Sequence, residues 1–272
     1  MNKIPKIIYE TDDGIAIITI NRPERRNALD GETLEMLNSC MDKAESDNEI
    51  KAIIINGRGN TFSSGFDLKD QLEKSPKGKE WKNILDLDFK TIMRFWHSSK
   101  PTIAAVRGAC LAGAFELALA CDITIASKDA FFGEPELKFG AGIVTMILPW
   151  VTSIKAAKEI ILLGKDNIPA DEALRLGLVT RVTENDSLQK KAKEIALNLA
   201  EIDPNLVSET KKAINQSYEI QGLLESLQNS LEIDYKIESK GSPDKKRFME
   251  IASDKGMKEA IAFRNSRFKS DA

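Results

Sequence analysis

The sequence predicts an α/β fold with a helical C-terminal region. Short apolar runs rich in β-branched residues alternate with amphipathic segments over the first part of the chain, and helical patterns dominate after residue 186. The chain has 272 residues, 42% hydrophobic and 30% charged, an ordinary profile for a globular protein. We therefore expect an α/β core that holds the active site over residues 1–200 and a helical region over residues 201–272.

The apolar pattern predicts the individual elements in order. Strands are expected where short apolar or β-branched runs occur, over residues 6–10, 14–20, 52–55, 102–106 and 122–126. Helices are expected where apolar residues recur at helical spacing, over residues 33–46, 81–96, 115–121, 153–163 and much of the chain after 186. Residues 69–79 are polar and contain Pro76 and Gly78, which predicts a surface loop.

Composition disfavours several classes of protein. The net charge of −3 gives no global basic field that would recruit nucleic acid. No apolar run reaches membrane-spanning length and Met1 to Glu10 hold no signal core, so we expect a cytoplasmic protein without a membrane partner. The three cysteines, Cys40, Cys110 and Cys121, form no CxxC pair and are expected to stay reduced. Ligand count and spacing also argue against zinc, and no metal site is predicted.

Residues 101–136 are the most informative stretch for function. A buried strand is followed by a turn of small residues, a helix that contains Glu116, a second strand and then Glu136 directly after Pro135. Gly113 lies three residues before Glu116, where the first N–H groups of the helix have no internal partner. Such an N–H can stabilise an oxyanion as it forms. Two acids and one N–H donor therefore indicate proton chemistry beside a carbonyl.

This stretch resembles the signature of the enoyl-CoA hydratase/isomerase (crotonase) superfamily. The matching motifs are Ala105-Val106-Arg107-Gly108, Gly113-Ala114-Phe115-Glu116-Leu117-Ala118 with Cys121-Asp122, and Phe132-Gly133-Glu134-Pro135-Glu136. The resemblance runs from about Lys6 to Phe268. It implies a crotonase-like spiral of ββα units, followed by helices that pack across subunits in homotrimers or hexamers and help to close the CoA site. It also implies an acyl-CoA substrate, with CoA entering as part of that substrate and no separate cofactor.

The resemblance implies a role for eight residues. Glu116 would position and deprotonate a water, and Glu136 would deliver a proton to the α-carbon. The remaining residues are the backbone N–H groups of Phe66 and Gly113 for the oxyanion hole, and Arg26, Ala28, Ser63 and Ser64 for CoA binding. From the residues alone, either acid has a structural alternative near the start of a helix. The arginine-rich loop around Arg26 could likewise be a solvated turn.

The sequence departs from the family pattern after Glu136. Many hydratases that it resembles continue with Gly-x-x-Pro-Gly-x-Gly-Gly-Thr-Gln-Arg, whereas this chain has an apolar stretch over Gly140–Trp150 that could begin a helix at Ile143. The change leaves both acids intact and alters what the acyl group would touch.

We expect an enoyl-CoA hydratase that adds water in a syn fashion to the 2,3-double bond of an acyl-CoA thioester. The main alternative is another crotonase-type acyl-CoA enzyme, such as a double-bond isomerase, a thioester hydrolase or a C–C bond hydrolase. A non-catalytic binder, for example of RNA, is a third reading, which the two acids and the negative charge disfavour.

Overall fold

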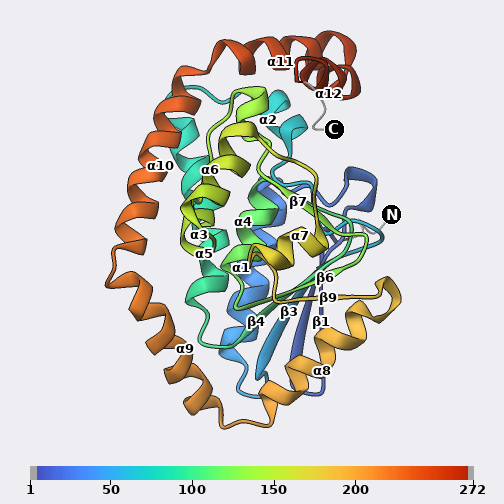
Figure 1. Ribbon diagram of the computed structural model, residues 1–272, viewed down its shortest axis with the longest axis vertical. Coiled ribbons are helices and arrows are strands. Elements are labelled where there is room, and N and C mark those ends of the chain that lie inside the picture. The colour runs from blue at the N-terminus through green and yellow to red at the C-terminus, as the bar shows by residue number, and fades with distance from the viewer. Residues whose placement is uncertain (1–4, 269–272) are drawn as a thin grey trace.

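A six-stranded sheet forms the centre of this computed structural model, which describes residues 5–268 (Figure 1). Its strand order is β1-β2-β3-β4-β6-β9, with an antiparallel hairpin at β1 and β2 and parallel pairing thereafter. The strands are β1 (Ile7–Asp12), β2 (Ile15–Ile20), β3 (Ala52–Gly57), β4 (Thr102–Val106), β6 (Ile123–Ser127) and β9 (Arg181–Thr183). The hairpin turn holds Asp13 and Gly14 at positive φ.

A second, three-stranded sheet lies beside the first. It contains β5 (Ala109–Leu111), β7 (Phe131–Gly133) and β8 (Ile168–Pro169) in the order β5-β7-β8. The chain enters the large sheet at β4 and the small sheet at β5, and it repeats that step with β6 and β7. This alternation confirms the expected spiral of ββα units. Strand β5 lies where the sequence predicted only a turn of small residues.

Helices cover both faces of the large sheet, which is why its central strands are apolar throughout. Ile53 and Ile55 point into the main core. The alternate residue Ile54 packs with Leu188 and Ala192 of α8 (Leu188–Ala200) on the opposite face. The helices that supply side chains to the main core include α1 (Gly31–Ser46), α3 (Glu80–His97), α4 (Gly113–Ala120), α6 (Ile154–Leu163) and α7 (Ala170–Arg175). Each of the predicted helices in this region is confirmed.

The C-terminal region is helical through residue 266, as expected, and residues 269–272 lie outside the described part of the chain. Its helices are α9 (Pro204–Glu219), α10 (Leu223–Lys240), α11 (Pro243–Lys255) and α12 (Met257–Ser266). Helices α9 and α10 run along one side of the molecule, and α11 and α12 lie across the end that carries α2 (Figure 1). Helix α10 packs on α3, and α11 contacts α2. Among residues 5–268, no helix is both long enough and apolar enough to cross a membrane.

Two local predictions are wrong. Residues 69–79 are mostly not a loop, because α2 (Leu68–Lys74) occupies them and the side chain of Asp67 caps that helix by accepting the N–H groups of Lys69 and Asp70. No helix begins at Ile143 either: the chain stays irregular until the short α5 (Leu148–Val151). Three short 3₁₀ segments complete the fold, η1 (Pro23–Arg25), η2 (Glu136–Phe139) and η3 (Asn185–Ser187).

Candidate active site

Glu116 lies on α4 with its side chain inside the protein, and only 1% of the residue is exposed. The helix is built almost wholly of apolar residues, so its fourth position carries the carboxyl into the core region between the sheets. Oε2 of Glu116 accepts the backbone N–H of Thr145 at 2.7 Å, whereas Oε1 has no hydrogen-bond partner among residues 5–268. One oxygen is therefore held in place, and the other is available to a ligand.

Glu136 approaches Glu116 from the segment after β7. Pro135 turns the chain, and Glu136 opens the 3₁₀ segment η2. A third acid, Glu134, stands just before this turn, where its backbone N–H bonds to the carbonyl of Lys165 at 2.8 Å. Carboxylate oxygens of Glu116, Glu134 and Glu136 all lie within 4.8 Å of one another, and all three side chains are buried. The structure thus brings together the two predicted acids and adds one that sequence reasoning quoted in a motif but did not assign.

Burial dominates the protonation of these acids. It raises the pKa of Glu116 well above the usual range, and the nearby charge of Glu136 raises it further, while the Thr145 N–H opposes both effects. Burial raises the pKa of Glu136 to about 7, and a hydrogen bond from the side chain of Glu134 works against that rise. Burial likewise raises the pKa of Glu134. Three carboxyls this close cannot all ionise, so protons are retained on the cluster near neutral pH.

Two backbone N–H groups lie beside the acids. Gly113 is the first residue of α4, and Phe66 follows Gly65, whose positive φ of 87° turns the chain toward Ala112 and Gly113. A Cβ on Gly113 would lie 2.3 Å from the ring of Phe66, so the two predicted oxyanion-hole residues are in direct contact. Among residues 5–268, the backbone hydrogen bonds give neither N–H an acceptor. Both donors are free for a ligand oxygen.

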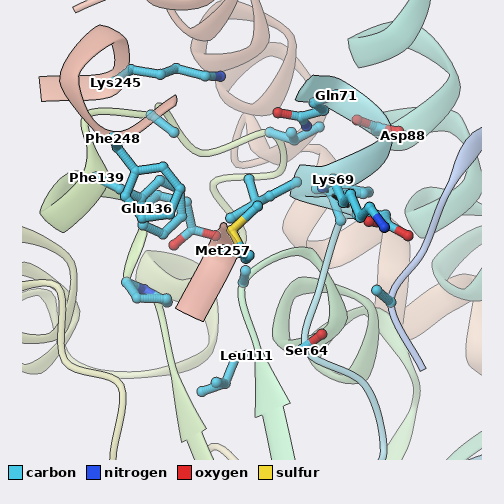
Figure 2. A pocket seen from close by; sticks show the side chains of 18 of the residues that line it. Ser64, Lys69, Gln71, Asp88, Leu111, Glu136, Phe139, Lys245, Phe248 and Met257 are labelled. Atoms are coloured by element: carbon cyan, nitrogen blue, oxygen red, sulfur yellow. Dashed lines mark hydrogen bonds between the residues drawn. The ribbon is translucent and has the colours of Figure 1, made fainter. Parts of the chain in front are cut away.

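A cavity of about 500 Å³ is lined by Glu116, Glu136, Phe66 and Ala112, the residue before Gly113. Figure 2 shows it from close by: Glu136 lies between Phe139 and Met257, with Ser64 and Leu111 on one side of the view and Lys245, Gln71 and Asp88 on the other. Helices α11 and α12 contribute part of its wall, among them Phe248, Ile261 and Arg264. The C-terminal helices therefore form one side of this cavity, and their expected role in closing a CoA site stays a prediction.

Three of the four residues predicted to bind CoA line this cavity. They are Arg26 and Ala28, from the loop after β2, and Ser64. Ser63 is different: it is fully buried, its N–H bonds to the carbonyl of Ala109, and its carbonyl accepts the N–H of Leu111. The backbone of Ser63 is therefore engaged in joining its segment to β5.

The loop that carries Arg26 and Ala28 is fixed by a buried ion pair. Arg22 is 7% exposed, and its Nη2 lies 2.9 Å from Oδ2 of Asp67 and 3.0 Å from Oδ2 of Asp30. Asp67 is adjacent to Phe66, so one guanidinium connects the loop after β2 to the segment with the oxyanion N–H. The arginines here are thus not all part of a solvated turn.

The cavity also contains acids that the sequence analysis did not name. Asp88 of α3 and Asp234 and Glu238 of α10 line it. The sequence held a signal for them, because they continue buried stripes at helical spacing. The stripes are Trp81, Leu85, Asp88, Ile92 and Phe95 on α3, and Leu223, Leu227, Leu231, Asp234 and Glu238 on α10. An acid at a buried position of an amphipathic helix indicates a partner inside the protein.

Among residues 5–268, Glu116, Glu134 and Glu136 form the group with ligand spacing for a metal ion. Their oxygen atoms would suit a hard cation. The same atoms are the ones that retain protons near neutral pH, and protonation competes with metal binding. The absence of a resident metal in this protein remains a prediction.

Comparison with known proteins agrees with this geometry. The enoyl-CoA hydratase/isomerase family model matches residues 10–254. A short-chain-enoyl-CoA hydratase of Clostridium acetobutylicum is 38% identical over 220 residues, which cover 79% of this chain and 82% of that protein. The crystal structure of an enoyl-CoA hydratase/isomerase from Xanthobacter autotrophicus Py2 superimposes with a TM-score of 0.97 at 58% identity, covering 98% of this chain and 100% of the other. An enoyl-CoA hydratase from Mycobacterium smegmatis gives a TM-score of 0.89 at 25% identity, with 98% and 95% covered. The chain belongs to the enoyl-CoA hydratase/isomerase family.

Proposed function

We propose that this protein is an enoyl-CoA hydratase that adds water across the 2,3-double bond of an acyl-CoA thioester. The observation that carries the proposal is the pair of buried carboxyls, Glu116 and Glu136, within 4.8 Å of each other in a cavity that Phe66 also lines, with Gly113 in contact with the ring of Phe66. The family relatives named as enoyl-CoA hydratases support the same reaction.

The two N–H groups would bind the thioester oxygen. Negative charge develops on that oxygen when water adds at the β-carbon, because the electrons of the double bond move toward the carbonyl. The N–H groups of Phe66 and Gly113 stabilise the enolate-like state more than the substrate, which lowers the barrier. A single donor of this kind typically contributes about 10²–10³ in rate.

The two acids would divide the proton transfers. The N–H of Thr145, 2.7 Å from Glu116, opposes the rise that burial causes in the pKa of Glu116, and an ionised Glu116 would orient the water and take its proton. Glu136, with a pKa of about 7, holds the proton that the α-carbon receives. Because one oxygen of each lies within 4.8 Å of the other, both groups could act on the same face of a bound double bond. This arrangement supports syn addition.

CoA would enter along the loop after β2. Arg26, Ala28 and Ser64 line that part of the cavity, and Lys69 and Lys258 bring positive charge to its wall. Helix α12, which carries Lys258, would help to cover the bound CoA. We further propose that no cofactor other than this substrate-borne CoA takes part.

A homotrimer or hexamer in the cytoplasm completes the proposal. Helix α9 exposes apolar side chains, including Leu206 and Ile214, more than half of each side chain being open in the single chain. The three thiols form no disulfide, in keeping with a reducing compartment. Light scattering after size exclusion gives the subunit number, and a monomer at micromolar concentration contradicts this part.

The test of the reaction is the loss of enoyl-thioester absorbance with crotonyl-CoA. We expect turnover in the wild type and a loss of about 10²–10⁴ in kcat/KM in both Glu116→Gln and Glu136→Gln. Circular dichroism and CoA binding check that the variants are folded, and Glu201→Gln on an exposed position serves as the matched control. Near-normal turnover in folded Glu136→Gln contradicts the assignment. A folded wild type that binds CoA and leaves every 2-enoyl-CoA unchanged points instead to the isomerase and hydrolase alternatives.

A further inference from the structure

Asp234 is a buried acid with no protein partner at the wall of the cavity. The residue is 2% exposed, and neither Oδ1 nor Oδ2 has a hydrogen-bond partner within residues 5–268. Nearly all buried carboxyls in folded proteins are bonded, so an unsatisfied one needs a reason. If the cavity bound only a hydrocarbon chain, an apolar residue at this position would make the protein more stable than the unpaired acid does. Asp234 therefore indicates a polar group that arrives with the ligand.

Two further carboxyls stand near Asp234. Asp88 lies on the side of the cavity away from Ser64 and Leu111 (Figure 2) and is 3% exposed. Glu238 bonds to Lys245, whose Nζ also lies 4.3 Å from the ring centroid of Trp81. The ammonium of Lys245 thus already interacts with the carboxyl of Glu238 and the ring of Trp81. Asp88 and Asp234 remain as the acids that a ligand could satisfy.

The protonation state of these two acids depends on what binds them. Burial raises the pKa of Asp88 well above its usual range and that of Asp234 to about 8, and neighbouring acids add to both shifts. The groups facing Asp234 include Glu238, Lys245 and Glu136. A bound group that donates hydrogen bonds would favour the ionised carboxylates and offset the cost of their burial.

The Gly140–Trp150 segment, which departs from the family pattern, contacts two of the acids of α10. A Cβ on Gly142 would lie 1.9 Å from Oδ1 of Asp234, so the carboxyl sits directly against the Cα of that glycine. The N–H of Gly142 donates to Oε1 of Glu238 at 3.3 Å. Three residues later, Thr145 holds Glu116. One short segment thus connects the acids of α10 to the proposed catalytic carboxyl.

Apolar side chains surround the place where the polar group of the ligand would bind. Trp81, Leu85, Val144 and Phe66 line the same cavity and belong to one hydrophobic cluster. Their position beside Asp88 and Asp234 describes a pocket for a chain that is mostly hydrocarbon with one polar substituent. Asp234 also lies close enough to Glu116 and Glu136 for their charges to interact. The substituent would therefore be near the reacting carbons, on the acyl side of the thioester.

Resting on the proposed hydratase function, we propose that the preferred substrate is a 2-enoyl-CoA whose acyl chain carries a hydrogen-bond-donating group, a hydroxyl or a protonated amine, bound by Asp234 and Asp88. Carboxylates accept hydrogen bonds from either group. An amine would in addition gain from their negative charge.

Matched substrate pairs test this proposal. Each pair keeps the number of heavy atoms and replaces a terminal methyl by a hydroxyl or an amine, for example hept-2-enoyl-CoA against 6-hydroxyhex-2-enoyl-CoA and 6-aminohex-2-enoyl-CoA, with shorter and longer chains in parallel. The readout is the ratio of kcat/KM for the polar substrate to that for its methyl counterpart. We expect this ratio to exceed about tenfold in the wild type at one or more chain lengths, because a site built around buried hydrogen-bonding groups rejects analogues that leave them unpaired.

Variants of Asp234 and Asp88 test whether these acids cause the kcat/KM preference for the polar substrate. Asp234→Leu is expected to bring the ratio below one. Asp234→Asn is expected to keep part of a hydroxyl preference and lose an amine preference, since a neutral amide accepts a hydrogen bond without supplying charge. Asp88→Asn gives a second variant should Asp234→Leu fail to fold. Glu232→Gln, on the exposed face of the same helix α10, is the matched control and should leave the ratio unchanged.

The outcomes separate this proposal from the proposed function. If the wild type hydrates methyl-terminated enoyl-CoAs better than every polar counterpart, the function stands and the inference fails. If no enoyl-CoA is hydrated, the proposed function fails. In that case calorimetric Kd values for the saturated acyl-CoA pairs still decide whether the pocket prefers the polar chain. Equal Kd values for polar and methyl chains overturn the inference.

Discussion

The backbone N–H of Thr145 donates a 2.7 Å hydrogen bond to Oε2 of Glu116. Thr145 belongs to Gly140–Trp150, the segment that departs from the family pattern. Glu116 lies on α4, whose sequence matches that pattern. This N–H bonds to a carboxyl 29 positions earlier in the chain. The segment that differs from the family pattern therefore contacts a proposed catalytic acid directly.

The pH dependence should be the same in the two directions of the reaction. Hydration needs Glu136 protonated and Glu116 ionised, and dehydration needs the reverse, so both directions use a site with one proton on this pair of acids. Because burial raises the pKa of Glu136 to about 7, we expect kcat/KM for hydration to fall as the pH rises through about 7, where the site loses that proton. The equilibrium constant of water addition does not change with pH, so kcat/KM for dehydration of the 3-hydroxyacyl-CoA should fall over the same range. A kcat/KM that stays constant through this range would contradict the role of Glu136.

Glu134 should influence the pH at which hydration declines, because it acts on the pKa of Glu136. Its side chain donates a hydrogen bond to Glu136 and so lowers the pKa of Glu136 from the value that burial alone would produce. Glu134→Leu removes the donor, and we expect the alkaline limb of the hydration profile to move to higher pH. Glu134→Gln keeps an N–H donor and should leave the limb near its wild-type position. An unchanged limb in folded Glu134→Leu would mean that Glu134 does not act on Glu136.

The ion pair of Arg22 with Asp30 and Asp67 should contribute to stability and to CoA binding. Arg22→Ala removes the guanidinium shared by two buried carboxylates, but Asp30 keeps Lys6 at 2.5 Å and Asp67 keeps Arg25 at 3.6 Å. We therefore expect a loss of stability below the value of about 3–5 kcal/mol that is typical of a buried charge left without any partner. Urea unfolding measures this loss, and CoA titration should show weaker binding because the loop with Arg26 is no longer fixed. Arg247→Ala, an exposed arginine with one surface partner, is the control and should change stability by less than about 1 kcal/mol.

Local sequence patterns were sufficient for most of the fold and for the two predicted acids. The strands and helices of the core have clear apolar periodicity, and Glu116 and Glu136 each stand in a short motif whose geometry is set by the adjacent turn. Helix α2 was missed because Pro76 and Gly78 suggested a loop, yet both lie beyond its last residue, Lys74.

Long-range contacts account for what the sequence did not reveal. The acids Asp88 and Asp234 are separated by 146 positions, and only the packing of α10 on α3 brings them to one cavity. The bonds from the N–H groups of Gly142 and Thr145 to side chains of α10 and α4 are equally long-range. Local propensity cannot anticipate acceptors supplied by distant elements.

The contact between Gly142 and Asp234 gives a final prediction. A methyl group at position 142 would lie 1.9 Å from Oδ1 and 2.8 Å from Cγ of Asp234, so Gly142→Ala must displace the carboxyl or the segment. We expect a loss of about 1–3 kcal/mol in the free energy of unfolding, typical of an overpacked site. Gly31→Ala is a suitable control, because its new Cβ would make an ordinary 3.5 Å contact with Nζ of Lys74. In the double variant with Asp234→Ala the clash is absent, and the two changes should show a coupling of about 1 kcal/mol or more in a double-mutant cycle. If the two changes in the free energy of unfolding are strictly additive, Gly142 does not interact with Asp234. The proposed contact between the Gly140–Trp150 segment and the acids of α10 would then not hold.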